Sequence, residues 1–536
     1  MSEDSKLSKR KRILLVGEFC LNRTGYSVMS YNILSRLHKL DKYEVAEMAV
    51  YCKADDIRIN YVPWKVYPVI PADSDETGRA QYESRPDAKF GSMIFEQTCL
   101  DFKPDIVIDF RDVQWMATYQ LTSPFREFYS LLWMPTIDAN PQTDDWLNQY
   151  VMTDSLLTYT HFAKTVLENS CGKTANILGV ASPGIDINEM KPLDKSEIRK
   201  KYGLPEDINI VGMVARNQLR KLYPDLFCMF REFLNEAPKE LAEKTFLHIH
   251  TGYPDQGWDI PRILKQYGLS HKVYFTYICA ACGNIKINKW NDYNIPCERC
   301  LNKSVIFTSP AFGVTRKRLC EIYNLYDFYI QYAALEGFGV PVVEAAACGI
   351  PLAVVPYSGM EDFVNLLNAH PIPIAKYVSE NQTHRIWAYP DNHLFAIQLI
   401  SILQTNLKKL GKMTRELCVE NYDWDKIAKI WENAIDNTRP AKRKWNEPQC
   451  DFSEKAPSKD MSNEDYVKLC IRDVGFSPFL EKGFLYSKMV KDLYNGFIQM
   501  GEANVPYGKD NILEQAKVLQ NNMIYWERIR CQQSST

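Results

Sequence analysis

The chain alternates between short runs of apolar, often β-branched residues and longer stretches whose apolar residues recur at helical spacing. Alternation of this kind is typical of α/β domains with parallel sheets. In the first part of the chain, residues 13–16 form an apolar run that ends in Gly17, and residues 28–40 have helical spacing. Further strands are predicted at residues 105–109, 129–134, 156–160 and 176–180.

A second series with the same pattern begins near Asp194. Its predicted strands cover residues 208–214, 245–250, 272–278, 328–331 and 352–355, with helices at 222–234 and 318–325 between them. We therefore predict two α/β domains in tandem, an N-terminal domain over residues 1–190 and a C-terminal domain over residues 191–423. They share a pattern and no sequence repeat.

The pattern changes after residue 437. Residues 438–463 are rich in Pro, Lys, Ser and Asp, which is typical of a linker. Residues 464–536 are predicted to form a small helical appendage, with Ser462 placed to cap its first helix.

Composition and charge narrow the class of protein. The chain has 536 residues, 46% of them apolar and 24% charged, which is typical of a globular protein with two to four domains. A net charge of −2 excludes a protein whose whole surface attracts nucleic acid or anionic membranes, although a local basic patch stays open. No uncharged apolar run reaches the roughly 18 residues of a spanning helix, and no signal-like apolar stretch precedes the first strand. Most cysteines are scattered singly, as buried thiols in a reducing compartment are, so we expect a cytoplasmic protein without stable membrane insertion.

The segment from Glu336 to Glu344 carries the clearest chemistry. It follows the predicted strand 328–331, and Gly337 and Gly339 permit a closer backbone approach than side chains would allow. A helix beginning near Val342 would direct free N–H groups at a diphosphate, and Glu344 in its first turn could accept hydrogen bonds from a ribose diol. The alternative is a glycine loop before an ordinary helix, with exposed glutamates.

Residues 334–351, ALEGFGVPVVEAAACGIP, closely resemble the donor-site signature of family-4 glycosyltransferases, in which two glutamates are separated by seven residues. The resemblance covers roughly residues 12–437 and implies the GT-B fold, with two Rossmann-like domains facing each other across a cleft. It also implies transfer from a nucleoside diphosphate sugar with retention of configuration and no catalytic metal. Glu344 would then bind the ribose hydroxyls, and Glu336 would lie beside the donor sugar as a catalytic residue. Gly337, Phe338 and Gly339 would belong to the same donor site.

Two basic residues strengthen the resemblance. Residues 210–216 are a predicted strand that ends in Arg216, and Lys221 lies five residues later. The family has an Arg and a Lys at this spacing, both directed at the donor phosphates. Fixed cations stabilise the negative charge that grows on a departing nucleotide. Arg220 is the alternative phosphate ligand to Lys221, and a pair of ordinary surface cations is the alternative to a phosphate site.

The resemblance is weaker in the first domain. Gly25 matches the family's phosphate-facing loop, residues 161–164 and 182–186 resemble the segments that close the domain, and residues 424–437 resemble the helix that crosses back to it. Many family members carry a His-Asp pair after the fourth strand, whereas residues 133–138 here contain Asp138 and no histidine. Asp138 is therefore either a catalytic residue that faces the sugar or the acceptor, or the cap of a local turn.

Three charged residues end another predicted strand of the first domain: Asp109, Arg111 and Asp112. Strand ends in α/β domains often carry ligand-binding residues, which makes acceptor binding one interpretation. A surface ion-pair network is the other.

Four cysteines form two C-x-x-C pairs with fourteen residues between them: Cys279, Cys282, Cys297 and Cys300. This spacing predicts a structural Zn²⁺ site in a zinc ribbon over residues 279–300, inserted in the C-terminal domain. The alternative is a pair of redox thiols. Lys286, Lys289, Trp290 and Tyr293 lie between the pairs, so the ribbon either contacts nucleic acid or stiffens a long loop.

The acceptor is less well defined than the donor, for which we expect a UDP-sugar. The overall pattern resembles glycosyltransferases of large DNA bacteriophages, which implies DNA as a partner, a hydroxymethylated pyrimidine as acceptor and a host cytoplasm as location. Such a base has to be flipped out of the duplex. A cell-surface glycan is the rival acceptor, and a non-catalytic binding protein on a degenerate GT-B fold is the rival class. The sequence leaves the sugar and the oligomeric state open.

Overall fold

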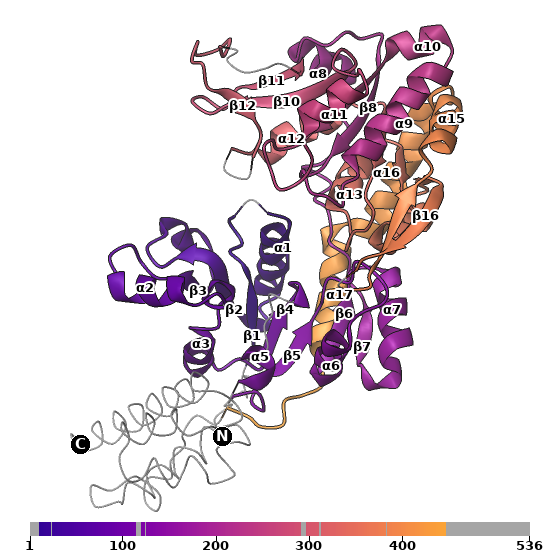
Figure 1. The fold of residues 1–536 in the computed structure, drawn as a ribbon. Helices are drawn as coiled ribbons and strands as arrows, with labels where there is room; N and C mark the ends of the chain where they lie inside the picture. The colour runs from indigo at the N-terminus through magenta and orange to yellow at the C-terminus, as the bar shows by residue number, and fades with distance from the viewer. Residues whose placement is uncertain are drawn as a thin grey trace, which may run out of the picture. The chain divides into compact units, whose positions relative to one another are not determined.

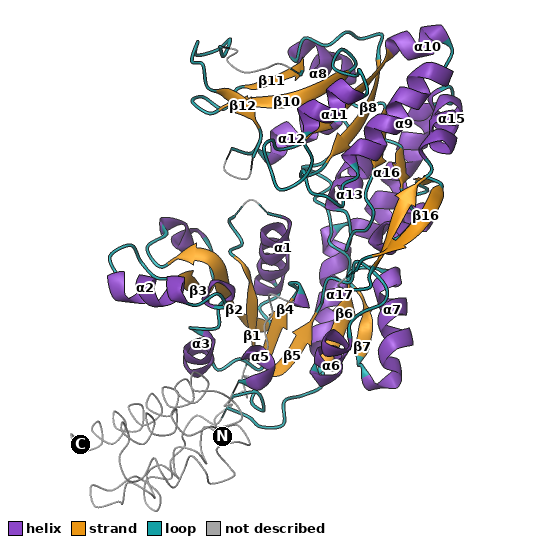
Figure 2. Ribbon diagram, viewed as in Figure 1, coloured by secondary structure: helices purple, strands orange, loops and turns teal. Residues whose placement is uncertain are grey.

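The computed structural model of the protein describes residues 10–22, 24–113, 119–123, 125–290, 296–309, 312–381 and 383–445. The predicted helical appendage over residues 464–536 lies outside these residues, as does the predicted linker from residue 446 onward. The described chain forms parallel α/β sheets with helices between successive strands (Figure 1, Figure 2).

Spatial contacts divide the described chain into two compact units. The first unit comprises residues 10–135, 148–156 and 434–445, and the second unit comprises residues 136–147 and 157–433. The domain limits at residues 190 and 423 stay predictions. None of the described helices combines the length and the apolar character that crossing a membrane requires.

The first sheet has the strand order β3-β2-β1-β4-β5-β6-β7. The strand pairs from β3 to β6 are parallel, as the alternation of strands and helices predicts. The strands are β1 (Lys11–Glu18), β2 (Tyr43–Lys53), β3 (Lys65–Ile70), β4 (Ile106–Asp109), β5 (Ser130–Trp133), β6 (Ser155–Thr158) and β7 (Ile177–Val180).

Helices of the first unit include α1 (Gly25–Lys39), α2 (Glu76–Ser84), α3 (Phe95–Phe102) and α5 (Tyr119–Thr122). Two more helices, α6 (Asp144–Met152) and α17 (Trp424–Asn437), have residues in both units. The bounds of α17 are those predicted for the late helix, and its Trp424 and Trp431 are buried.

Strands β2 and β3 were not predicted, because charged and polar residues interrupt their apolar pattern. In β2, Glu44 is exposed but Glu47 is fully buried. The Glu47 carboxylate accepts hydrogen bonds from the backbone N–H of Cys20 (2.7 Å) and from Nε1 of Trp64 (3.2 Å). A buried acid can therefore occupy a central strand, because local hydrogen bonds satisfy it.

The second sheet has the order β11-β10-β9-β8-β13-β14-β15, with β12 also paired to β10. The pairs from β10 through β9, β8, β13 and β14 to β15 are parallel, whereas β11 and β12 run antiparallel to β10. The strands are β8 (Asn209–Val214), β9 (Thr245–His250), β10 (Val273–Cys279), β11 (Ile285–Lys289), β12 (Val305–Phe307), β13 (Phe328–Gln331), β14 (Leu352–Val354) and β15 (His370–Pro371).

The second unit contains the following helices besides parts of α6 and α17. The longer ones are α7 (His161–Cys171), α9 (Tyr223–Glu236), α12 (Arg316–Tyr323), α13 (Val340–Ala347), α15 (Asn392–Leu403) and α16 (Leu407–Tyr422). Shorter ones are α8 (Lys195–Lys201), α10 (Lys239–Lys244), α11 (Ile260–Gln266) and α14 (Glu361–Leu366). A separate hairpin is formed by β16 (Ile374–Ser379) and β17 (Ile386–Pro390).

Candidate active site

The backbone at Glu336 is held by the segment that follows β14. Its N–H donates to Oγ of Ser358 (2.8 Å), and that hydroxyl donates to the Glu336 carbonyl oxygen (3.0 Å). The N–H of Gly359 donates to the same carbonyl oxygen (2.9 Å). An added Cβ at position 359 would lie 2.7 Å from that oxygen, so only glycine fits. The loop between β13 and α13 is thus fixed at its first glutamate.

Glycine is required at positions 337 and 339 of the loop for two different structural reasons. A Cβ at Gly337 would lie 2.2 Å from Cγ2 of Thr136, so Gly337 permits a close approach between two segments of the second unit. Gly339 caps α13 with φ +106°, a conformation that favours glycine. Between them, the ring of Phe338 is buried against Phe363 and Tyr422. The Phe338 side chain therefore serves packing, and a donor contact at this position would involve its backbone.

Lys221 and Glu336 form an ion pair in which each side chain is only 7% exposed. Nη2 of Arg220 lies 3.6 Å from Oε2 of the same glutamate. Burial, and after it the charge of Arg220, lowers the pKa of Lys221. The side chains of Lys221 and Arg220 thus face one carboxylate, and the Arg220 guanidinium is 33% exposed. Such a cluster favours an anionic ligand that adds the missing negative charge.

Arg216 forms a bidentate ion pair with Asp255, with Nε and Nη2 at 2.8 and 3.0 Å from its carboxylate oxygens. The Arg216 side chain is 49% exposed. Hydrogen bonding to Arg216 lowers the pKa of Asp255. Asn217 fixes the loop of Asp255, because its side chain exchanges two hydrogen bonds of 2.8 Å with the backbone of Trp258. Sequence pattern alone did not single out Asp255, the partner of Arg216, or the contact of Asn217 with Trp258.

The position of Glu344 in its helix differs from the position that the sequence predicts. Helix α13 begins at Val340, two residues before the predicted start, and has Pro341 in its first turn, a position that suits proline, so Glu344 lies beyond the first turn and not within it as predicted. The alternative of exposed glutamates is wrong for Glu344, which is 4% exposed. Its carboxylate accepts a hydrogen bond from the Tyr323 hydroxyl (2.7 Å) and pairs with Arg316.

Asp138 lies in the segment of the second unit that approaches the loop between β13 and α13 through Thr136. This loop is called the donor loop below, after the family resemblance. Arg385, at the start of β17, approaches both carboxylate oxygens of Asp138 at 3.4 and 3.5 Å. The same guanidinium pairs with Glu380 (3.1 Å). The hairpin β16–β17 is therefore tied to the Asp138 segment, a connection that sequence separation hid.

In the first unit, Gly25 is the first residue of α1, after Thr24 whose hydroxyl accepts the Ser27 N–H (3.1 Å). A Cβ at Gly25 would meet nothing within 4 Å, so its phosphate-facing role stays a prediction. Asp109 and Arg111 are fully buried and form a multidentate ion pair. The expectation of a surface network is wrong for this pair, because it is a core interaction that also includes Gln120 (2.8 Å).

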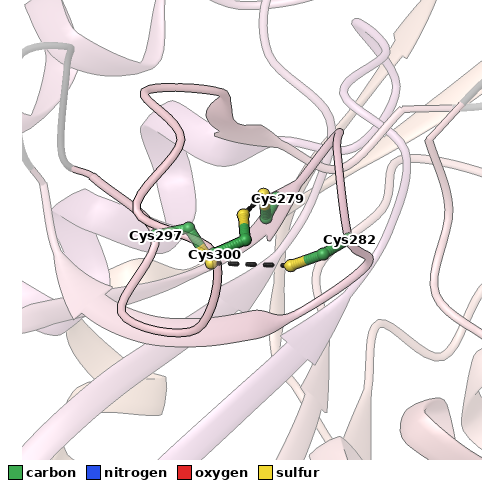
Figure 3. Close-up of side chains that lie close together, drawn as sticks. All are labelled: Cys279, Cys282, Cys297 and Cys300. Carbon is green, nitrogen blue, oxygen red and sulfur yellow. Dashed lines mark hydrogen bonds between the residues drawn. The ribbon is translucent and has the colours of Figure 1, made fainter.

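The four predicted cysteines gather in one cluster (Figure 3). Their Sγ atoms all lie within 4.8 Å of one another, and the Cys279–Cys300 and Cys282–Cys297 Sγ pairs are each 3.6 Å apart. A tetrahedral metal with bonds of about 2.3 Å to sulfur separates its ligands by about 3.8 Å. The cluster therefore fits a tetrahedral ion with four thiolate ligands.

The two halves of the cluster have the same backbone turn. The N–H of Cys279 donates to Asn284 O, and that of Gly283 donates to Cys279 O, each at 2.8 Å. In the other half, Cys297 N–H donates to Asn302 O (2.9 Å) and Leu301 N–H donates to Cys297 O (2.8 Å). Both residues that follow the second cysteine of a pair have positive φ, at +69° and +58°. Paired turns of this kind aim backbone and thiols at a common centre.

The other residues of the module are engaged in internal contacts. The Trp290 ring packs on Phe307 and Phe275 with ring centroids 5.1 and 5.7 Å apart, and Nζ of Lys286 pairs with Glu298 (2.6 Å). Lys289 lies over the ring of Phe246. Tyr293 lies outside the described residues. Of the two interpretations, these contacts favour a module that stiffens the long loop after β10, and they do not favour a surface that contacts nucleic acid.

Comparison with known proteins bears on family and fold. Residues 298–370 match the family model described as Glycosyl transferases group 1. The D-inositol 3-phosphate glycosyltransferase of Stackebrandtia nassauensis is 26% identical over 208 residues, which are 39% of this chain and 40% of that protein. A protein of the same name from Mycobacteroides abscessus is 26% identical over 183 residues, 34% of this chain and 32% of that protein. The chain thus spans well under half the length of the curated relatives it matches.

Solved structures resemble more of the chain. Sucrose-phosphate synthase from Thermosynechococcus elongatus superposes with a TM-score of 0.56 at 16% identity, over 80% of this chain and 98% of the other. HepE of Anabaena, in complex with UDP and glucose, gives a TM-score of 0.53 at 13% identity, over 80% and 100%. At such identities the likeness shows the fold. The parallel α/β sheets and these likenesses agree on the GT-B fold, and residues 298–370 resemble the group 1 glycosyltransferases.

Proposed function

We propose that this chain transfers a sugar from a nucleoside diphosphate sugar, with UDP-sugar as the expected donor, to a hydroxyl acceptor with retention of configuration. The observation that carries the proposal is the cluster of buried Lys221 and Glu336 with half-buried Arg220 at the loop before α13. Its excess of basic side chains suits a diphosphate. HepE, a structure with the same fold, was solved with UDP bound.

In this mechanism the bond between the anomeric carbon and the β-phosphate oxygen breaks, and the acceptor oxygen bonds to the anomeric carbon from the same face. The acceptor proton passes to the departing phosphate oxygen. Lys221, Arg220 and Arg216 stabilise the charge that grows on the nucleoside diphosphate, so no catalytic metal is needed for that role. Glu336 lies next to Lys221 and is placed to contact the donor sugar.

Glu344 is proposed to bind the ribose hydroxyls, and Asp138 to face the sugar or the acceptor. The contact of Thr136 with Gly337 supports the second assignment, because it brings the Asp138 segment to the donor loop. A dead transferase fold would have no need to keep Lys221, Arg220 and Glu336 together in one cluster, which supports an enzyme over a binding protein.

For the acceptor we propose a hydroxymethylated pyrimidine in DNA, with a cell-surface glycan as the rival. This proposal rests on the resemblance to bacteriophage enzymes. The internal contacts of Trp290, Lys286 and Lys289 give it no support, so a DNA contact surface would have to lie elsewhere.

The test is an assay of the full chain with a panel of nucleotide-sugars and two DNA substrates, one hydroxymethylated and one plain, read by mass spectrometry of nucleosides. Sugar on the hydroxymethylated nucleoside supports the whole proposal. Donor hydrolysis without any modified nucleoside removes the DNA acceptor and leaves the transferase. Neither hydrolysis nor calorimetric binding of any donor would favour a non-catalytic protein.

We also propose that the cysteine cluster holds a structural Zn²⁺. Four thiolates leave no coordination position for substrate, so the ion would act on folding and not on the reaction. The paired turns at Cys279 and Cys297, with their matching hydrogen bonds, support a metal over a redox thiol pair.

A further inference from the structure

The carboxylate of Glu344 is held from the two ends of α12, by its first residue, Arg316, and its last, Tyr323. Oε2 accepts the Tyr323 hydroxyl at 2.7 Å, and Oε1 pairs with Arg316. Glu344 and Tyr323 are both buried. A buried carboxylate is costly unless hydrogen bonds and a counter-charge compensate it, so these partners are needed for Glu344 to be ionised there.

Arg316 is itself fixed by a second carboxylate. Its Nε lies 3.1 Å from Oε2 of Glu189, while its Nη1 faces Glu344. Burial opposes the charge of Arg316, but the carboxylates of Glu344 and Glu189 outweigh it, and its pKa is raised. The guanidinium is therefore a permanent, doubly anchored cation, and it cannot turn away from Glu344 without leaving Glu189.

We propose that Arg316 and Tyr323 are positioning residues that orient Glu344 so that the site selects ribonucleotide donors over 2′-deoxyribonucleotide donors. The inference rests on the proposed function, in which Glu344 binds the ribose. Each Glu344 oxygen has one lone pair taken by a protein donor, which leaves one on each for the two hydroxyls of a ribose.

Selectivity follows from the fixed geometry. A ribose supplies two O–H donors to two oriented acceptors, whereas a 2′-deoxyribose leaves the second lone pair of one oxygen of the buried carboxylate without a donor. Leaving a buried charged acceptor unpaired is more costly than the gain from pairing it. A site built to hydrogen-bond a hydroxyl rejects the analogue that lacks it strongly. If Glu344 were free to rotate, it would turn to satisfy the single hydroxyl, and selectivity would fall.

The chain contains a matched control on the same helix. Glu321 is likewise buried and accepts hydrogen bonds from the Tyr202 hydroxyl (2.6 Å) and from Arg318 (2.8 Å). This Tyr–Arg–Glu group has the same side-chain types as the Tyr323–Arg316–Glu344 group, with Lys201 as a further partner of Glu321 (2.8 Å). Since no donor role is assigned to Glu321, changes to Tyr202 or Arg318 test for a general effect on α12.

The experiment measures binding of UDP, ADP and GDP, and of their 2′-deoxy counterparts, to the full chain by calorimetry. For the nucleotide that binds, we expect the wild type to prefer the ribo form by at least about 100-fold. Tyr323→Phe should lower this ratio by about tenfold, mainly by weakening ribo binding. Arg316→Met should lower it further, and Arg316→Lys should restore part of it. Tyr202→Phe and Arg318→Met should leave the ratio unchanged.

Several outcomes would overturn the inference. The first is an equal affinity of the wild type for the ribo and deoxy forms. The second is a ratio of ribo to deoxy affinity in both Tyr323→Phe and Arg316→Lys that equals the wild-type ratio. The third is an equal loss of this ratio in the control variants. Thermal unfolding of each nucleotide-free variant identifies loss of fold. If Tyr323→Phe does not fold, the ratio of ribo to deoxy affinity of Arg316→Lys decides the test. If no nucleoside diphosphate binds the wild type, the proposed function fails first.

Discussion

Nζ of Lys221 contacts Oε1 of Glu336, and both groups are withdrawn from solvent. The two residues are far apart in the chain but are joined through the loop before α13, where the Ala334 N–H donates to the Arg220 carbonyl oxygen (2.8 Å). The proposed phosphate ligand and the proposed sugar contact are therefore one structural unit. Changing either should affect donor binding and turnover together.

Replacing Glu336 by glutamine removes the negative charge while keeping the shape of the side chain. We expect kcat to fall by about 100-fold or more, because the group next to the reacting sugar loses its charge and Lys221 loses its counter-ion. Steady-state kinetics measure the effect, with the donor that the panel of nucleotide-sugars selects. Glu321→Gln, which removes a buried carboxylate paired with Lys201, is the control. Near-normal turnover of Glu336→Gln would remove Glu336 from the catalytic residues.

Gly337→Ala should weaken donor binding through a steric clash. The added Cβ would lie 2.2 Å from Cγ2 of Thr136, which forces the donor loop or the Asp138 segment to move. We expect a loss of about 1–3 kcal/mol in the free energy of unfolding and a weaker affinity for UDP. Thr136→Ala removes the clashing methyl, so the double variant should recover most of both losses.

A suitable control for this pair is Gly313→Ala, whose Cβ would meet only Ser309 O at an ordinary 3.6 Å. Denaturant unfolding and calorimetry of the four proteins form a double-mutant cycle. Additive effects of Gly337→Ala and Thr136→Ala would contradict the contact.

The cysteine cluster should contain one Zn²⁺ per chain in freshly purified protein, measured by elemental mass spectrometry. Removal of the metal with a chelator should loosen β10, β11 and β12, because the ion joins the turns that connect them. Amide hydrogen exchange in residues 279–289 should then accelerate by about tenfold or more. Cys282→Ser should give the same result without a chelator.

Cys171→Ser, a change in α7 far along the chain from the cluster, is the matched control and should retain the metal. Protein that is fully active, folded and free of metal from the start would contradict the zinc site. A disulfide found by mass mapping in each C-x-x-C pair would favour the redox alternative.

Glu47 should make the stability of the first unit depend on pH. Burial raises the pKa of this carboxyl to about 7 from 4.5, against the hydrogen bonds from Cys20 and Trp64. Because the folded pKa is the higher one, the folded state holds the proton more tightly. Its stabilising effect is complete below about pH 4.5 and is lost as the pH rises through 7. The loss should approach about 3 kcal/mol.

Urea unfolding between pH 5 and pH 8 checks this sign. The free energy of unfolding of the wild type should fall between pH 5 and pH 8 because Glu47 loses its proton. Glu47→Gln should have a flatter pH profile. Glu44→Gln, an exposed acid on the same strand, should behave as the wild type does. Identical profiles for the wild type and Glu47→Gln would contradict the raised pKa.

Local pattern predicted the central strands of both sheets closely. The expected strands at residues 245–250 and 328–331 coincide with β9 and β13, because most of their residues are apolar or aromatic and buried. Pattern failed at β2, where Glu47 is buried among apolar residues, and at the hairpin β16–β17, whose exposed residues lack a core-facing alternation.

The candidate site divides in the same way. Glu336, Lys221, Glu344 and the four cysteines stood out from the sequence, because their spacing is set by one loop, one helix or one pair of tight turns. The partners that define their chemistry did not. Tyr323 precedes Glu344 by more than twenty residues, and Asp255 follows Arg216 by nearly forty, with no local pattern to mark either.

The sequence by itself determined the α/β class, the donor loop and the cysteine spacing, since each depends on residues close together in the chain. Only the tertiary structure decided that Glu344 is buried between Arg316 and Tyr323, that Asp109 and Arg111 form a core ion pair, and that Gly337 makes room for Thr136. The physical reason is that burial and charge pairing depend on which distant segments pack together. That packing is a property of the whole sheet and its covering helices, which no local spacing encodes.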